Sequence, residues 1–224
     1  MPHARTILVG TPAMDGRVHV EYVQALLQSQ IAARHAGISV TIHFVVQDSL
    51  IMQARNGILA VFRESEATDL VFIDSDIAWD PEGFLKLVAH DVPIVAGVYR
   101  RKSENISFTV QFPDSKSVQR DVRSGLIEAS RVGAGFLRLR RDAIEQMVAA
   151  YPQLRHVPSA SGEELDRYGL FDTSLKDGAF CGEDYTFCDR WRAIGGTIWI
   201  DPDIRLSHIG TTAYTGSIWD FLKS

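Results

Sequence analysis

Short apolar runs alternate with helix-like segments along the first hundred residues, and this alternation constrains the fold more than any other feature. Apolar runs, continuous or at every second position, predict strands; they are 6–10, 38–46, 70–73 and 93–98. Segments with apolar residues at three- and four-residue spacing predict helices; they are 20–35, 49–66 and the stretch that begins at Asp80-Pro81. Strands that alternate with helices form a largely parallel sheet covered on both faces. We therefore expect an α/β fold with a mostly parallel central sheet flanked by helices.

The second half of the chain is less regular. The predicted strands are 106–112, 126–128, 132–139 and 197–200, and the predicted helices are 141–151 and 183–194. Residues 152–180 are rich in Pro, Ser, Gly and charge, and we expect them to form a long loop, which often carries function. The residues after 200 are expected to form a tail. No clear linker divides the chain, so residues 1–224 are predicted to form a single domain.

Composition narrows the class of protein. With 46% hydrophobic and 23% charged residues, the 224-residue chain has the make-up of an ordinary globular domain. Its net charge of −5 gives no overall basic field that would attract nucleic acid or anionic lipid. The two cysteines provide no disulfide framework, and neither a signal peptide nor an apolar stretch of about 20 residues is present. A cytoplasmic location is therefore expected.

The sharpest local feature is the acidic turn Asp74-Ser75-Asp76, which directly follows the apolar run LVFI. Ligands of open α/β sheets bind at the carboxyl ends of the strands, where these acids are predicted to lie. Two close carboxylates repel each other unless a cation or a proton intervenes, and a hard divalent cation that bridges phosphate oxygens meets that need. The alternative is a solvated turn in which Asp76 caps the next helix, because acids are common in turns.

A second acidic pair, Glu183-Asp184, opens the predicted helix 183–194. The N-terminal end of a helix stabilises a carboxylate through its free N–H groups and the helix dipole. Asp184 is therefore either a capping residue or a general base. As a base it would stay ionised near neutral pH and take a proton from a hydroxyl group.

Further candidates gain weight only beside these acids. His208 follows the last predicted strand, and a histidine together with a carboxylate suits Mn²⁺. Arg101 and Lys102 belong to a basic run that either neutralises a diphosphate or an anionic acceptor, or forms a solvated loop. Arg55 faces either a nucleotide or the solvent. The Gly-Ala-Gly sequence at 133–135 lacks the spacing of a dinucleotide-binding loop, so we expect close strand packing there.

The order of these motifs resembles that of the GT-A glycosyltransferases, especially the inverting GT2-like group. A strand, DSD, a small helix, a strand, GED at a helix start and SHIG follow one another over nearly the whole chain. The compact length and the segment QARNGILAVF also look like those of small phage and giant-virus glycosyltransferases. The chain is shorter than most members of the family and lacks an obvious acceptor domain. It also lacks the Gln of the QxxRW motif before its Asp-Arg-Trp at 189–191, so we infer no processive activity.

The resemblance implies a division of labour along the chain. Residues 1–100 would bind a nucleotide-diphosphate (NDP) sugar as the donor, and residues 101–224 would form the acceptor side. In the family the DxD acids contact the donor ribose and a divalent metal. This implies that Asp74, Ser75 and Asp76 bind the donor and that Mn²⁺ or Mg²⁺ is held by Asp76, with Asp74 and His208 as its other ligands.

The remaining site residues follow from the same resemblance. Thr11, Pro12 and Ala13 correspond to the region that receives the nucleotide base. Arg55, Arg101 and Lys102 are expected to contact the donor. The acceptor-side acid of the family corresponds to Asp184, with Glu183 as its neighbour, and together they are the expected catalytic residues.

Several alternatives stay open at this point. The acceptor is expected to be a glycan or another hydroxyl compound, a glycosylated DNA base included. Inversion is favoured because Asp184 stands in the position of the inverting base, although retaining enzymes of this fold also carry DxD and a late histidine. A sugar nucleotidyltransferase would carry a Gly-rich basic loop at 11–17, where this chain is poor in Gly. A non-catalytic sugar-nucleotide binder would have no need of Asp184.

Overall fold

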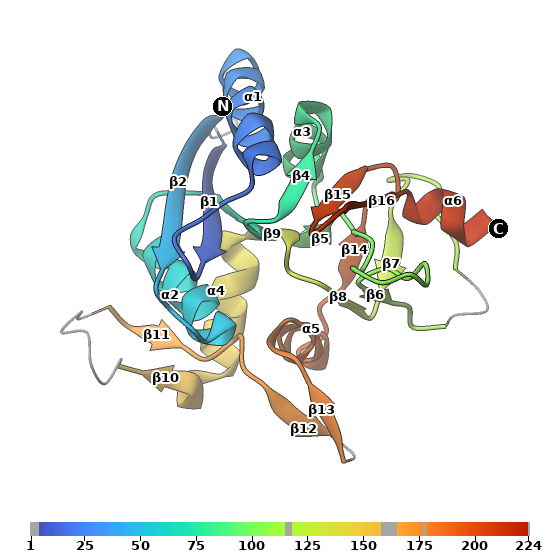
Figure 1. Cartoon of the computed structure of the whole chain (residues 1–224). Coiled ribbons are helices and arrows are strands. Elements are labelled where there is room, and N and C mark those ends of the chain that lie inside the picture. The colour runs from blue at the N-terminus through green and yellow to red at the C-terminus, as the bar shows by residue number, and fades with distance from the viewer. Residues whose placement is uncertain (1–4, 115–117, 158–164, 177, 224) are drawn as a thin grey trace.

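A seven-stranded sheet separates two layers of helices (Figure 1). The computed structural model describes residues 5–114, 118–157, 165–176 and 178–223. Across the sheet the strands are β2 (Ser39–Val46), β1 (Thr6–Ala13), β3 (Asp69–Ile73), β9 (Phe136–Arg140), β5 (Ile94–Ala96), β14 (Ile198–Ile200) and β7 (Ile127–Ala129). Strands β9 and β7 run opposite to the other five, so the expected α/β fold with a mostly parallel sheet is confirmed.

Alternate residues of the central strands face the two helical layers. In β3, Leu70 and Phe72 join one hydrophobic cluster with helices α2, α4 and α5, whereas Val71 and Ile73 join the other with α1 and α3. The helices are α1 (Val20–His35), α2 (Ile51–Glu64), α3 (Pro81–Ala89), α4 (Arg141–Ala150) and α5 (Glu183–Ala193). All five were predicted, with boundaries within two residues of those seen. Within the described residues, none of the helices combines the length and apolar character that a bilayer crossing requires.

Helix α1 does not bury the apolar stripe that predicts it. Val20, Leu27 and Ile31 are 55–68% exposed. The buried face carries Tyr22 and Leu26 together with small residues such as Ala25 and Ser29, and Ser29 accepts a hydrogen bond from the indole of Trp79 in the core. Helical spacing therefore predicts the helix correctly but not the whole of the face that packs.

The expected tail after residue 200 is wrong. It contains strands β15 (Leu206–Ile209) and β16 (Ala213–Gly216) and a final helix, α6 (Ile218–Lys223). Strand β15 also pairs with β4 (Ile77–Trp79), so these three strands form a second sheet. The polar residues in the middle of β15 and the shortness of β4 leave no alternation for the sequence to show.

The predicted loop 152–180 is also more ordered than expected. Residues 158–164 and 177 of it lie outside the described residues. The rest contains a short 3-10 helix and two ribbons: η1 (Pro152–Leu154), β10 (Arg155–His156) with β11 (Arg167–Tyr168), and β12 (Ser174–Lys176) with β13 (Ala179–Cys181). Asn56 of α2 bonds to both backbone groups of Phe171, whose ring stacks on Phe187 at 4.3 Å. Leu170 and Phe171 of this segment are therefore part of the core.

Close packing also divides the predicted strand 132–139. It becomes β8 (Arg131–Val132), which pairs with β6 (Val110–Gln111), and the central strand β9. The glycine-containing segment 133–135 between them passes over the end of β3, where the N–H of Asp74 donates to the carbonyl oxygen of Gly135. The backbone there bonds to a turn rather than to a neighbouring strand, which interrupts the predicted strand.

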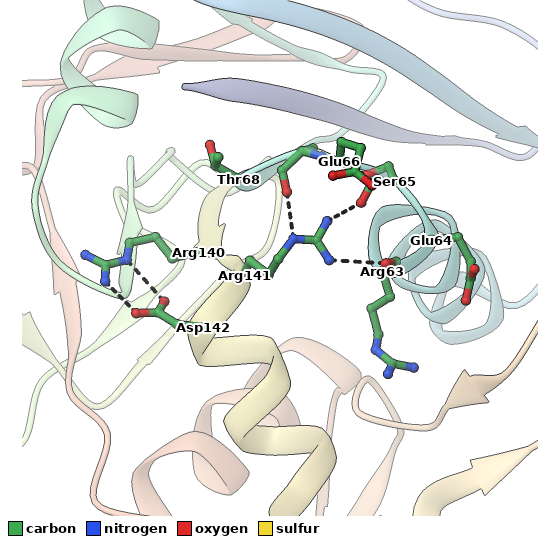
Figure 2. Close-up of a pocket in the computed structure, with 9 residues that line it drawn as sticks. Arg63, Glu64, Ser65, Glu66, Thr68, Arg140, Arg141 and Asp142 are labelled. Atoms are coloured by element: carbon green, nitrogen blue, oxygen red, sulfur yellow. Dashed lines mark hydrogen bonds and ion pairs between the residues drawn. The ribbon is translucent and has the colours of Figure 1, made fainter. Parts of the chain in front are cut away.

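Arg141 joins the C-terminal end of α2 to the start of α4 (Figure 2). A helix end leaves carbonyl groups without backbone partners, and this guanidinium supplies donors for them. Over distances of 2.7–3.1 Å it donates to the carbonyl oxygens of Phe62, Arg63, Ser65 and Ala67. The neighbouring Arg140 pairs instead with the exposed carboxylates of Asp91 and Asp142.

Replacing Arg141 should therefore destabilise the fold. Arg141→Met leaves several carbonyl groups without their charged donor and should lower the free energy of unfolding by about 2–3 kcal/mol. Arg140→Met, the matched control, removes only exposed ion pairs and should cost less than about 1 kcal/mol. Urea unfolding measures both, and equal losses would contradict the role of Arg141 in joining α2 to α4.

Candidate functional site

The acidic turn 74–76 lies at the carboxyl end of β3. The N–H of Asp74 donates to the carbonyl oxygen of Gly135 at 3.1 Å, and the N–H of Ile77 donates to that of Asp74 at 3.0 Å. Both ends of the turn are thus fixed by backbone hydrogen bonds. The carboxylate of Asp74 pairs with Arg55 and that of Asp76 pairs with Lys102, so the site consists of two groups of contacts.

Asp74 pairs with the buried side chain of Arg55, which is only 3% exposed. The Nη2 atom of Arg55 donates to Oδ1 of Asp74 at 2.9 Å, and its Nε atom donates to Oε1 of Glu183 at 3.2 Å. Burial acts to lower the pKa of Arg55, but these two carboxylates raise it above its usual value. One guanidinium therefore joins the turn after β3 to the start of α5.

Asp76 faces the second group. Its Oδ2 atom accepts a hydrogen bond from Nζ of Lys102 at 2.6 Å and lies 3.4 Å from Nε2 of His208. Burial acts to raise the pKa of Asp76, but hydrogen bonds from His208 and Lys102 outweigh it and lower the pKa to about 2. His208 pairs with Ile77 in the second sheet, so β15 and β4 fix the histidine beside the turn.

The other ring nitrogen of His208 determines what the histidine presents to Asp76. Its Nδ1 atom lies 3.0 Å from the carbonyl oxygen of Arg100, which can only accept, so Nδ1 carries the hydrogen. The Nε2 atom of the ring faces Oδ2 of Asp76 at 3.4 Å, so a proton or a cation between them satisfies both atoms. Among the described residues, no three His, Cys, Asp or Glu side chains gather as a metal site.

Asp184 begins helix α5 beside Glu183. The N–H of Tyr185 donates to its Oδ1 atom at 2.7 Å. Burial, followed by the charge of Glu183, raises the pKa of Asp184 to about 6, against the opposing effect of Arg55. A carboxyl group with a pKa near the working pH is suited to accept and release a proton.

The glycine segment 133–135 packs closely against Asp74 after β3 and Tyr99 after β5. A Cβ atom on Gly135 would lie 2.7 Å from the hydroxyl oxygen of Tyr99 and 2.8 Å from Oδ2 of Asp74, and one on Gly133 would lie 2.8 Å from the same hydroxyl. The expectation of close packing at 133–135 is therefore confirmed. Tyr99, which is buried at the head of the basic run, was not among the predicted site residues. Its place directly after an apolar strand was the only available signal.

The basic run extends from one acidic group to the other. Arg101 donates to the hydroxyl oxygen of Tyr185, next to Asp184, at 3.0 Å, while Lys102 reaches Asp76. Two consecutive side chains thus contact both halves of the site. Arg101 and Lys102 are exposed and lie beside the two acidic groups.

The predicted base-binding residues lie at the end of β1. Thr11, Pro12 and Ala13 are all buried, so they present little surface of their own. The Oγ1 atom of Thr11 lies 2.6 Å from the hydroxyl oxygen of Tyr22. Ser75 contributes its carbonyl oxygen, which accepts from the N–H of His19 and so ties the turn to the start of α1.

A cavity of about 510 Å³ lies elsewhere, around Arg141 (Figure 2). It is at the end of the sheet where β3 begins, whereas the acidic turn is at the end where β3 finishes. Its charged side chains largely pair with nearby groups, as Arg63 does with Glu145. Its contacts are explained by the joining of α2 to α4, and we do not regard it as the functional site.

Comparison with known proteins identifies the fold. No protein-family model matches the chain, and no curated protein matches its sequence. The solved structure of A197 from STIV is 16% identical, with a TM-score of 0.55 over 92% of this chain and 86% of that one. A mutant of Drosophila β1,4-galactosyltransferase 7, solved with manganese, UDP-Gal and xylobiose, is 14% identical, with a TM-score of 0.51 over 99% and 80%. The chain therefore has the GT-A fold found among glycosyltransferases.

Proposed function

We propose that this chain is a glycosyltransferase that moves a sugar from an NDP-sugar to a hydroxyl group of an acceptor. The observation that carries the proposal is the link through Arg55 between the acidic turn after β3 and the Glu183-Asp184 pair. That link brings a site for a charged donor close to a carboxyl group with a raised pKa. The complex of the Drosophila fold neighbour with manganese, UDP-Gal and xylobiose supports the same chemistry.

The side chains of Asp76 and His208 fit a divalent cation that is held jointly with the donor. Metal-binding histidines usually donate their other N–H to an oxygen, as Nδ1 of His208 does to the carbonyl of Arg100. One carboxylate and one imidazole suit Mn²⁺, and substrate phosphates with water commonly complete such a site. The cation would offset the charge of the diphosphate leaving group.

The basic run would assist at the same place. Lys102 and Arg101 lie where they can donate charge-assisted hydrogen bonds to diphosphate oxygens. For Lys102 this requires giving up its present bond to Asp76, a carboxylate that the cation would then share with His208. Loading the site therefore changes the partner of Lys102 rather than leaving it without one.

Asp184 is the proposed general base. It removes the proton of the acceptor hydroxyl group as that oxygen forms a bond to the anomeric carbon and the bond to the diphosphate breaks. This single displacement inverts the anomeric configuration. Glu183 is less suited to the role because Arg55 already engages its carboxylate.

The ribbon of β12 and β13 offers a surface for the acceptor. It extends away from the central sheet and leads directly into α5 (Figure 1). Leu175 and Phe180 are cross-strand partners on it and are 80% and 73% exposed. Exposed apolar side chains on the ribbon that leads into the helix of the proposed base favour an acceptor with an apolar face, such as a sugar ring. The acceptor class remains a glycan or another hydroxyl compound, a glycosylated DNA base included.

Replacing the proposed base tests the chemistry. Asp184→Asn keeps the size and capping ability of the side chain but removes its basicity, so transfer should fall by about 10²–10⁴-fold. Binding of the donor should survive because it depends on the other side of the site. The donor is first chosen by a thermal-shift screen of UDP, GDP, TDP and CMP, and release of the nucleotide then measures transfer. Near-normal transfer in Asp184→Asn would eliminate this residue as the base.

The pH dependence tests the same residue independently. The base must be ionised, and burial raises the pKa of Asp184 to about 6. The rate should therefore rise through pH 6 and level off above it, falling about tenfold per unit on the acid side. Rates measured between pH 4.5 and 8 should show this limb in the unaltered protein. A limb of the same midpoint in Asp184→Asn would assign it to another group.

Two histidine variants, His208→Ala and the control His90→Ala, test whether a metal ion binds at the site. Mn²⁺ should increase the thermal stabilisation given by the nucleoside diphosphate, EDTA should remove that increase, and His208→Ala should lack it. His90 offers a matched control, since its Nε2 atom lies 2.8 Å from the carboxylate of Asp201 away from the site. His90→Ala should keep the increase due to Mn²⁺. If EDTA has no effect on the unaltered protein, the metal is not part of the site.

A further inference from the structure

Arg55 combines deep burial with two acidic partners from distant parts of the chain. Its three guanidinium nitrogens point to Asp74, Glu183 and the carbonyl oxygen of Ala134, at 2.9, 3.2 and 3.5 Å. The side chain lies over the ring of Phe72, 5.4 Å from its centroid. All its contacts are therefore with the protein, and at 3% exposure it offers no free face to a donor.

The geometry of its guanidinium group lets Arg55 fix the positions of Asp74 and Glu183 relative to each other. The group is planar and rigid, so donors at fixed angles hold their acceptors at fixed positions relative to each other. One acceptor closes strand β3 and the other opens helix α5. Arg55, near the start of α2, is thus the part that sets where the first turn of α5 stands against the end of the sheet.

The same contact sets the charge around Asp184. The charged groups that act on Asp184 are Glu183 on its own helix, Arg55 on α2 and Asp74 at the end of β3. The two carboxylates disfavour its ionisation and the guanidinium favours it. Without the guanidinium of Arg55, Asp184 would share a buried site with the two negative charges of Glu183 and Asp74.

Resting on the function proposed above, we propose that Arg55 is a positioning residue for Asp184. It holds Glu183, and with it the first turn of α5, and it supplies the positive charge that lets Asp184 ionise near neutral pH. This role differs from contact with the donor, which the resemblance to GT-A enzymes implies for this residue.

Opposite shifts in two variants test the proposal. Arg55→Met removes a positive charge near Asp184 and should raise its pKa by about one unit or more, whereas Glu183→Gln removes a negative charge and should lower it by a similar amount. Carboxyl-carbon NMR of protein labelled at aspartate measures the titration directly, with Asp184→Asn to assign the signal. Arg63→Met, on the exposed side of the same helix, removes an ion pair with Glu145 and should leave the titration unchanged.

A conservative variant separates charge from position. Arg55→Lys keeps the charge but loses the planar fork, so the titration of Asp184 should stay close to that of the unaltered protein while transfer falls. If Arg55→Met does not fold, the comparison of Glu183→Gln with Arg55→Lys still tests the proposal. Shifts of the same sign in Arg55→Met and Glu183→Gln, or none in Glu183→Gln, would overturn it. Full transfer by Asp184→Asn would instead reject Asp184 as the base and leave the NMR result standing, whereas no transfer by the unaltered protein with any donor of the screen would reject the proposed function.

Discussion

Strand β9 enters the sheet between β3 and β5 and runs against both, and the candidate site depends on this insertion. It joins β2, β1 and β3 on one side to β5, β14 and β7 on the other. Neighbouring strands lie about 4.8 Å apart, so the ends of β3 and β5 are roughly 10 Å from each other. That spacing suits a lysine from the segment after β5 to reach Asp76, and the glycine entry to β9 lets the chain cross above Tyr99 without collision.

The carboxyl groups of Asp184 and Asp76 affect the stability of the fold in opposite ways. The carboxyl group of Asp184 has a pKa of about 6 in the fold and about 4 in the unfolded chain, so it binds more protons when the chain is folded. Its contribution to stability is therefore lost as the pH rises through this interval, by about 2–3 kcal/mol when complete. Asp76 has the opposite sign, because a folded-state pKa of about 2 adds stability above pH 4. The stability contributions of Asp184 and Asp76 therefore change with pH in opposite directions.

The sequence predicts the elements of this fold better than their partners. The helices and the strands of the first half follow from local spacing, and the turn 74–76 and the helix start at 183 place their acids at element ends. The orientation of Arg55 does not follow, because a mid-helix arginine next to Asn56 can face either way until the rest of the chain packs. The pairing of β15 with β4 cannot be predicted from the sequence either, because each strand is too short to show a pattern and the two lie far apart in the chain. Asn56 holds Phe171 in place for the same kind of long-range reason.

The sequence separations of the contacts to Arg55 imply an order in which the site assembles. The contact with Asp74 spans 19 residues, whereas the contact with Glu183 spans 128. The entropy lost in closing a loop grows with its length, and non-local pairings form slowly. The guanidinium and Asp74 can therefore meet while the first half folds, before α5 docks. When α5 docks, Glu183 then meets a guanidinium that Asp74 can already hold in place.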